Sequence, residues 1–327
     1  MKKMKLNKII LRCVVFVLIL IILLEICSVI TLPKDNTEKA GVPYLETTAI
    51  GVFAEKKNSI DVYFMGDSEA YSAYIPMDGW GDYGFTAYAH GVPSQPLIDC
   101  YYDFIKVMKN QNPKVVMLET DSIYQWYSKS RPLAETSYKI LPVIEYHNRW
   151  KTLNSDDFKF EFKNTYVDDS KGLFLCKSIK QVKTDYQEKF MQENKGTTKI
   201  KNLNKICLKL IKQYCDSHDI ELILVTAPNS GNWNYKKHNG IQQWADSNNV
   251  KYIDMNLLTK EIGLDWNTDA RDVKGHHINY FGAKKVTTYL NKYLKENYDL
   301  PDHRGDINYD NWAKSYENFQ TAVQNEK

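Results

Sequence analysis

Two short segments near opposite ends of the chain carry residue types that could act together in nucleophilic catalysis. The first is Gly66-Asp67-Ser68, and the second is a loop with Asp272, His276 and His277. A serine hydroxyl is a weak nucleophile until a base removes its proton, and a histidine oriented by a carboxylate is such a base. The pattern therefore predicts acyl transfer through Ser68, with one of the two histidines as the base and Asp272 to orient it.

Each segment also has an ordinary structural interpretation. Gly-Asp-Ser is common in turns, where the serine would cap a helix, and a pair of histidines in a polar loop is usually only solvated. The catalytic interpretation is favoured because the two segments occur together, in this order, at the two ends of one alternating pattern of strands and helices.

That pattern predicts an α/β domain with a parallel sheet covered on both faces. Strands are expected at residues 60–65, 85–89, 115–118, 222–226 and 252–255, and helices at about 96–110, 203–218 and 280–294. Asn279 is placed to cap the last of these helices. Sheets of this kind place their sites at the carboxyl ends of the strands, and Ser68 follows the first strand directly.

An apolar stretch at residues 13–32 is long enough to cross a bilayer as a helix, and only Glu25 interrupts it. Residues 1–12 form a basic segment, and positive charge stays on the cytoplasmic side. The sequence therefore predicts a single-pass anchor in the cell membrane with the C-terminal domain outside. A cleaved signal peptide is the other interpretation, but the apolar run is long and no small-residue cleavage site closes it.

The rest of the chain divides into three parts. Residues 33–58 are expected to form a polar tether, residues 59–298 the catalytic domain, and residues 299–327 a polar tail. Within the domain, residues 122 to about 198 break the alternation of strands and helices. They are interpreted as an insertion over the site.

Charge and residue spacing exclude several classes of function. The formal net charge of the chain is +3, and the basic residues before the anchor more than account for this excess. The outer part is therefore close to neutral and offers no basic surface to nucleic acid. No cysteine or histidine spacing typical of a metal site occurs, so neither a metal nor another cofactor is expected.

In its motifs the chain resembles the SGNH/GDSL hydrolase family over residues 60–296. Gly66-Asp67-Ser68 is similar to the family block that carries the nucleophile. Gly91 corresponds to the glycine whose N–H helps to form the oxyanion hole, and His277-Ile278-Asn279-x-x-Gly282 resembles the block with the catalytic histidine. The resemblance implies that His277 is the base and that the fold is a three-layer, flavodoxin-like sandwich.

Two features depart from the family pattern. Glu119-Thr120-Asp121 stands where the family has Gly-x-Asn, whose asparagine completes the oxyanion hole, so Thr120 or a backbone N–H is expected to replace it. Lys274 occupies the place of the family's acid, three residues before the histidine. Asp272 is the nearest carboxylate, and Asp269 is the alternative.

These departures and the single N-terminal span resemble a membrane-anchored subgroup of the family. The subgroup includes DltD, which acts in the D-alanylation of teichoic acids, and proteins of polysaccharide O-acetylation. The resemblance implies an esterase or acyltransferase acting on O-acyl groups of an acylated cell-wall polysaccharide or a teichoic acid. The alternative is an accessory partner of an integral-membrane O-acyltransferase, with any catalysis secondary.

Further residues at expected strand ends and in the insertion are candidates for contact with substrate. They are Asp67, His90, Glu119, Asn229, His147 and Arg149. The guanidinium of Arg149, in a polar and aromatic part of the insertion, could bind a phosphate. The plainer interpretations are turns, a structural histidine at a strand end, and a packed hinge of the insertion.

Overall fold

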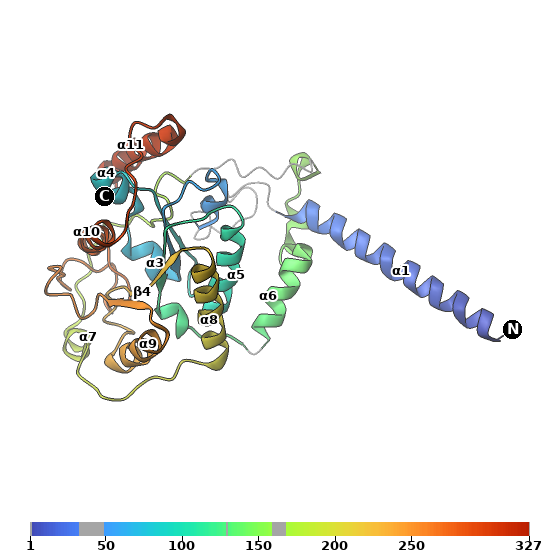
Figure 1. The fold of residues 1–327 in the computed structure, drawn as a ribbon, viewed down its shortest axis with the longest axis horizontal. Helices are drawn as coiled ribbons and strands as arrows, with labels where there is room; N and C mark the ends of the chain where they lie inside the picture. The colour runs from blue at the N-terminus through green and yellow to red at the C-terminus, as the bar shows by residue number, and fades with distance from the viewer. Residues whose placement is uncertain (1, 33–48, 129, 159–167, 327) are drawn as a thin grey trace. The chain divides into compact units, whose positions relative to one another are not determined.

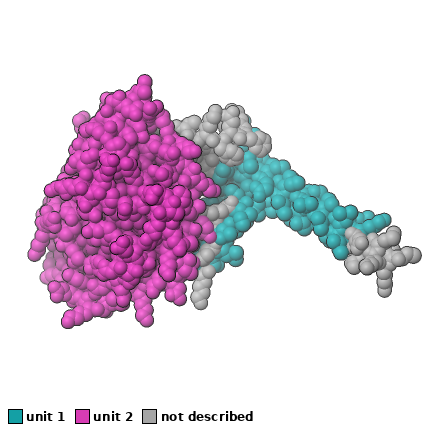
Figure 2. Space-filling model, viewed as in Figure 1, with its two compact units in different colours: residues 1–43, 127–165 teal, residues 44–126, 166–327 magenta. Residues whose placement is uncertain are grey.

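The computed structural model describes residues 2–32, 49–128, 130–158 and 168–326. The chain divides into two compact units (Figure 2). The first comprises residues 1–43 and 127–165, and the second comprises residues 44–126 and 166–327. Most of the expected tether, residues 33–48, lies outside the described residues.

The second unit is built on a five-stranded parallel sheet with the order β2-β1-β3-β4-β5. The strands are β1 (Val62–Gly66), β2 (Ala87–Gly91), β3 (Val115–Glu119), β4 (Glu221–Thr226) and β5 (Lys251–Asp254). This order is that of the flavodoxin-like doubly wound fold, in which ligands bind beyond the carboxyl ends of the strands. The predicted α/β class and all five predicted strands are confirmed.

Helices cover both faces of this sheet (Figure 1). α5 (Leu97–Met108) and α8 (Asn202–Ser217) pack together over one face, α5 against β1 and α8 against β4. α3 (Ser68–Ala73), α4 (Pro76–Tyr83) and α10 (Tyr280–Asn297) pack together over the other. α9 (Tyr235–Asn248), which the sequence pattern did not reveal, lies against β5. The result is the predicted three-layer sandwich.

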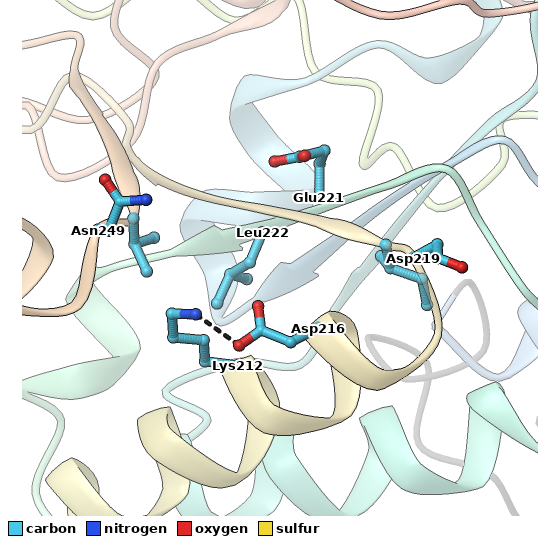
Figure 3. A pocket seen from close by; sticks show the side chains of 8 residues that line it. Lys212, Asp216, Asp219, Glu221, Leu222 and Asn249 are labelled. Carbon is cyan, nitrogen blue, oxygen red and sulfur yellow. Dashed lines mark hydrogen bonds and ion pairs between the residues drawn. The ribbon is translucent and has the colours of Figure 1, made fainter.

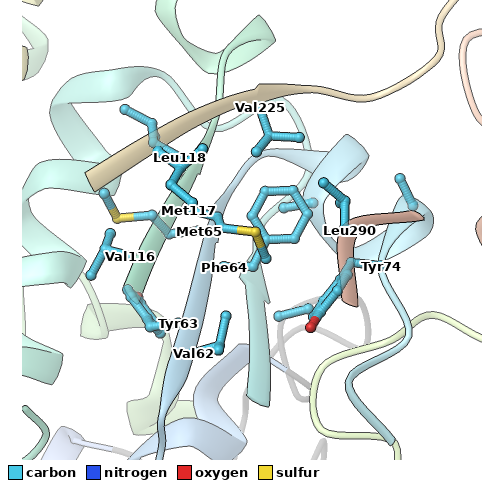
Figure 4. Packing of buried hydrophobic residues seen from close by; sticks show 14 of the residues in the cluster. Val62, Tyr63, Phe64, Met65, Tyr74, Val116, Met117, Leu118, Val225 and Leu290 are labelled. Atoms are coloured by element: carbon cyan, nitrogen blue, oxygen red, sulfur yellow. The ribbon is translucent and has the colours of Figure 1, made fainter. Parts of the chain in front are cut away.

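The central strands are hydrophobic on both sides because both faces are covered. Every residue of β1 and β3 is buried. Phe64 pairs in register with Met117, and the ring of Phe64 meets that of Tyr74 edge to face, with centroids 5.5 Å apart. Figure 4 shows Leu290 of α10 close to this group. The core therefore fixes the end of β1, where Ser68 follows.

Residues 49–58 belong to the domain rather than to a tether. A 3-10 turn, η2 (Gly51–Ala54), buries Val52, and the Glu55 carboxylate binds the Lys171 ammonium at 2.7 Å with both side chains fully buried. The expected polar tail is also structured: α11 (Asp310–Asn325) buries Trp312 and packs on α4. The polar composition of both segments concealed the few buried side chains that hold them.

The expected insertion divides between the two units. Residues 127–165 cluster with the N-terminal segment, whereas residues 166–198 belong to the second unit. There, backbone hydrogen bonds join Phe174 to Tyr71 and Val182 to Trp266. The described part of this stretch, residues 168–198, contains only one short helix, α7 (Thr184–Lys189), and is otherwise irregular.

The first unit contains the long helix α1 (Lys2–Thr31), α6 (Arg131–Ile140) and the short 3-10 turns η4 (Pro142–Ile144), η5 (His147–Lys151) and η6 (Ser155–Phe158). By length and composition, residues 8–31 of α1 could cross a membrane, with a mean hydropathy of 3.2. The predicted apolar helix is therefore present.

Candidate active site

Ser68 stands at the carboxyl end of β1, on a sharp turn into α3. Asp67 caps this helix, because its side chain accepts the backbone N–H of Glu69 at 3.0 Å. The turn needs glycine before it: a Cβ on Gly66 would lie 2.5 Å from the Cβ of Glu119 on the neighbouring strand. The Ser68 side chain is left half-buried at the edge of the sheet.

His277 reaches Ser68 from the loop before α10. Its Nε2 lies 2.8 Å from the Ser68 Oγ. Asn279 caps α10 as predicted, accepting the N–H groups of Phe281 and Gly282. Its amide nitrogen also donates to the carbonyl of Thr268 at 2.8 Å. These bonds fix the backbone at Asn279, two residues after His277. The loop that carries the imidazole is therefore held on its C-terminal side.

Asp272 holds the same loop from the other side. Its carboxylate accepts the backbone N–H groups of Lys274, His276 and His277 at 3.0, 3.2 and 2.9 Å. One of its oxygens lies 3.5 Å from Nδ1 of His277. Burial alone would raise the pKa of Asp272, but the hydrogen bonds from His277 and its neighbours lower it far below its ordinary value. The group is therefore a carboxylate at neutral pH.

The two alternatives kept open for the base and the acid lie elsewhere. His276 turns toward the loop after β4, where its ring would be 2.9 Å from a Cβ built on Gly231. The carboxylate of Asp269 is buried and forms an ion pair with Lys285 at 2.6 Å. The structure thus brings together Ser68, His277 and Asp272, and assigns His276 and Asp269 other contacts.

Gly91 lies opposite Gly66 in the register of β1 and β2. A Cβ at this position would lie 2.3 Å from the backbone oxygen of Asp67. The close approach of Gly91 to the turn that carries Ser68 is compatible with the expected role of the Gly91 N–H in an oxyanion hole.

Thr120 does not fit the oxyanion role expected for it. It is fully buried, its N–H donates to the carbonyl of Val225 at 3.0 Å, and its hydroxyl is 2.5 Å from that of Thr226. Both of its polar groups are therefore occupied inside the sheet, because β4 lies against β3 on that side.

Four buried carboxyl groups lie at or just after the ends of β1 and β3 and form a single cluster: Asp67, Glu69, Glu119 and Asp121. Gln125 donates to Asp67 at 2.7 Å and to Asp121 at 3.3 Å. A side-chain oxygen of Glu119 accepts the N–H of Asp121 at 2.8 Å. Parallel strands end at the same edge of a sheet, which is why acids distant in sequence meet here.

Three acids of this cluster, Asp67, Glu69 and Glu119, hold their protons more tightly than free carboxyl groups do. Burial and the charge of Asp121 raise the pKa of Asp67 to about 7. Burial, with the charge of Asp67 as the next cause, raises the pKa of both Glu69 and Glu119 well above the ordinary value. Burial therefore favours the neutral form of Glu119, which would not repel a developing oxyanion as a carboxylate would.

Sequence reasoning missed two cations near this cluster, Lys237 and Arg271. Lys237 binds Asp121 at 3.0 Å, and Asn232 donates to both oxygens of Asp121 at 2.8 and 3.1 Å. Arg271 donates to the hydroxyl of Ser72, one turn after Ser68, at 2.8 Å. The only available signal for these donors was the presence of acidic residues at two strand ends. Buried carboxyl groups require hydrogen-bond donors or cations nearby.

Three of the strand-end candidates for substrate contact are buried among these partners and offer no surface. Asp67 and Glu119 are fully buried. Asn229, also buried, donates to Glu69 at 2.8 Å and accepts the N–H groups of the turn after it. Their role is to support α3 and the strand ends rather than to contact substrate.

His90 is likewise a core histidine rather than a substrate ligand. Its Nδ1 lies 2.7 Å from the hydroxyl of Tyr63, and its ring packs edge to face on Phe53 and Tyr63. Burial lowers the pKa of His90, so the ring stays neutral. The structural interpretation of this residue was the right one.

His147 and Arg149 belong to the first unit. The Arg149 guanidinium is buried, donates to the carbonyl of Thr31 at 2.6 Å and binds the Asp157 carboxylate at 2.7 Å. The guanidinium is therefore packed within the first unit, the plainer of the two interpretations, and is not open to a phosphate. His147 is exposed and bonds only the carbonyl of Ile144 at 2.8 Å among the described residues.

A separate cavity of about 330 Å³ lies at the other end of the sheet (Figure 3). It is lined by polar and charged residues at the start of β4 and the ends of α8 and α9, including Glu221, Asp219 and Asn249. Lys212 and Asp216 form an ion pair across part of it. It opens at the amino end of β4, so it is not the site of Ser68.

No protein-family model and no curated protein matches the chain. Solved structures are similar at low levels. A GDSL-like lipase from Bacteroides thetaiotaomicron has 10% identity and a TM-score of 0.38, covering 78% of this chain and 98% of its own. An acetylxylan esterase from Geobacillus stearothermophilus has 12% identity and a TM-score of 0.38, covering 74% and 96%. Values this low carry no assignment of function, which depends instead on the geometry around Ser68.

Proposed function

We propose that this protein is a serine esterase or O-acyltransferase of the SGNH/GDSL type. The observation that supports it most strongly is the 2.8 Å contact between Ser68 Oγ and His277 Nε2, with Asp272 on the Nδ1 side of the same ring. Because an ionised carboxylate only accepts hydrogen bonds, Asp272 favours the tautomer with the proton on Nδ1. Nε2 is then free to take the serine proton.

The proposed reaction has two steps. His277 takes the Ser68 proton as Oγ attacks the acyl carbonyl, and the N–H groups of Ser68 and Gly91 hold the oxyanion. His277 returns the proton to the departing alcohol, which leaves an acyl-serine. Water or a polymer hydroxyl then attacks this ester, His277 takes its proton, and Ser68 is regenerated with that proton.

The proposed setting is the outer face of the cell membrane. The apolar length of α1 and the basic residues before it support a single-pass anchor with the second unit outside. A tethered enzyme there would meet O-acyl groups of a cell-envelope glycopolymer, an acylated polysaccharide or a teichoic acid. A protease added to intact cells should digest the second unit; protection until the cells are lysed would place it inside.

A fluorophosphonate probe tests the chemistry directly. It should label the full-length protein at Ser68, and Ser68→Ala should abolish the labelling while the melting temperature stays close to that of the wild type. The half-buried hydroxyl contributes little packing, so a large loss of stability is not expected. Labelling that persists in Ser68→Ala would show that another serine is the nucleophile.

An accessory role beside an integral-membrane O-acyltransferase is the second candidate. The acids at the end of β3 favour it, since Glu119 belongs to the segment where the family has its oxyanion-hole asparagine, and Asp121 of the same segment is already engaged by Lys237. In that case the purified protein would bind acylated polymer but leave both the probe and an activated ester unreacted.

A further inference from the structure

The last turn of α1 is covered by protein, unlike the rest of the helix. Ser28 and Thr31 are 3% and 6% exposed, whereas Phe16 is 65% exposed. The Ser28 hydroxyl accepts the N–H of Val143 at 3.1 Å. The residues that cover this turn come from a segment we call the shelf, residues 131–158.

A buried ion pair fixes the shelf to this turn. Arg149 donates to the carbonyl of Thr31 and at the same time binds Asp157, which also accepts the N–H of Asn154 at 2.9 Å. The carbonyls of a helix's last turn lack partners within the helix, and Arg149 satisfies one of them. The shelf is therefore attached at the point where α1 ends.

The shelf exposes large apolar side chains. Leu133 and Ile140, seven residues apart on one face of α6, are 75% and 63% exposed. Trp150 is 67% exposed, with the Lys151 ammonium 5.7 Å from its ring centre, and Phe158 is exposed as well. Side chains of this size in one short segment mark a surface that meets something apolar.

We propose that the shelf lies in the outer interface of the bilayer and inserts these side chains among the lipid headgroups and upper acyl chains. The proposal rests on the proposed membrane span of α1. The uncovered part, residues 8–27, is about 20 residues long and reaches roughly 30 Å as a helix, the thickness of the hydrocarbon core. Its basic residues Lys8 and Arg12 lie near the cytoplasmic end, where their long side chains can reach the headgroups. The covered turn, and with it the shelf, then lies at the level of the headgroups.

Two residue types agree with this depth. Tryptophan favours the membrane interface, where its ring is part apolar and part polar, and a lysine beside it can bind lipid phosphate. Glu25, near the end of the uncovered part, is exposed and falls close enough to the interface to stay hydrated. The length of α1 fixes the depth of the shelf relative to the bilayer. A bilayer is therefore favoured over a protein partner as the apolar surface that the shelf meets.

Photocrosslinking in cells that express the full chain tests this. Benzoylphenylalanine is placed singly at Leu133, Ile140 or Trp150, with Ile19 of α1 as the positive control and Ile307, 77% exposed in the second unit, as the negative control. These side chains are exposed, so the exchange should not disturb folding. The expected result is a phospholipid adduct at the shelf positions and at Ile19, and none at Ile307.

The other outcomes are distinct. Lipid adducts at Ile19 but none at the shelf would overturn the proposal that the shelf meets the bilayer, and would leave the proposed anchor intact. Discrete protein adducts at the shelf would show that a partner covers it, which also overturns the proposal. Absence of lipid at Ile19 would refute the anchor and the shelf together. Fluorophosphonate labelling of the same samples reports the esterase proposal independently.

Discussion

Asp272 holds His277 at two points: its carboxylate accepts the backbone N–H of His277 at 2.9 Å and lies 3.5 Å from Nδ1 of the ring. One acid thus holds the backbone of the residue and also lies beside Nδ1, where a carboxylate favours the tautomer that carries the proton on that nitrogen. Asp272 lies five residues before His277, whereas the family pattern has the acid three residues before the histidine. The longer spacing is possible because the loop folds around the carboxylate, which accepts three of its backbone N–H groups.

Substitutions of the two acids near this loop, Asp272 and Asp269, distinguish an effect on the orientation of His277 from an effect on stability. Asp272→Asn should lower the turnover of an activated acyl ester by about 10²-fold or more, because the amide cannot stabilise the imidazolium. Asp269→Asn should instead lower the melting temperature, since it leaves Lys285 without its carboxylate, and leave turnover nearly unchanged. Turnover and thermal unfolding of both variants decide the assignment. The reverse pattern would make Asp269 the acid.

The two adjacent histidines provide a matched comparison. His277→Ala should reduce turnover as severely as Ser68→Ala does, because nucleophile and base act as a unit. His276→Ala removes a ring that faces Gly231, so turnover should fall much less. Steady-state kinetics on one ester compares the three variants. If His276→Ala were the inactive variant, His276 would be the base, and the contact between His277 and Ser68 would be wrong.

Gly91 is a position where one methyl group should disturb the site. In Gly91→Ala the new Cβ would meet the backbone oxygen of Asp67, a cost of about 1–3 kcal/mol in the free energy of unfolding. Displacing the turn before Ser68 should also lower turnover by about 10²-fold. Gly196→Ala, at an exposed site, is the control and should change neither. Wild-type turnover in Gly91→Ala would contradict the close approach of β2 to this turn.

The acid cluster should give the domain an unusual pH dependence. Folding raises the pKa of Asp67 from 3.8 to about 7, so the folded state binds this proton more tightly than the unfolded chain. Its stabilising contribution is complete below about 3.8 and is lost as the pH rises to about 7, with a slope of up to about 1.4 kcal/mol per pH unit. Urea unfolding at several pH values measures it.

Asp67→Asn is the control for that dependence. The amide keeps the acceptor for the N–H of Glu69 but does not titrate in this range. The slope between pH 4 and pH 7 should therefore decrease, although Glu69 and Glu119 should preserve part of it. An unchanged slope would mean that Asp67 is ionised in the folded protein.

The buried pair of Lys171 and Glu55 makes a test of packing far from the chemistry. Lys171→Ala leaves a carboxylate buried without a partner and should cost about 3–5 kcal/mol. The double variant Lys171→Met with Glu55→Gln, which removes both charges, should cost much less than Lys171→Ala. Lys212→Ala, which breaks an exposed pair with Asp216, should cost less than about 1 kcal/mol. Equal costs for the two lysines would argue against burial of Lys171.

Local patterns predicted much of this architecture. The five strands were visible because buried parallel strands are continuous hydrophobic runs, and the cap at Asn279 because capping depends on a single residue type. Ser68 and His277 could be proposed because they fall in short recognisable segments. These features depend on neighbours in the sequence, which a sequence displays directly.

Contacts between distant segments were not predictable in the same way. Thr120 was expected to face the site, but the side on which a strand residue lies depends on which strand is next to it, and β4 occupies the polar groups of Thr120. For Arg149 the sequence left phosphate binding and a packed position both open, because nothing in the sequence connects it to Thr31. Glu119 was expected to be charged because its burial follows only from the assembled sheet.

Lys171 also bears on the order in which the second unit can be completed. Its ammonium binds Glu55 and lies 4.5 Å from the ring centre of Trp312, so it joins the first, middle and last segments of the second unit. During synthesis Glu55 is made early, but Lys171 follows more than a hundred residues later and Trp312 near the end. Until α11 is made, the buried ion pair therefore lacks the aromatic ring that covers it in the finished protein.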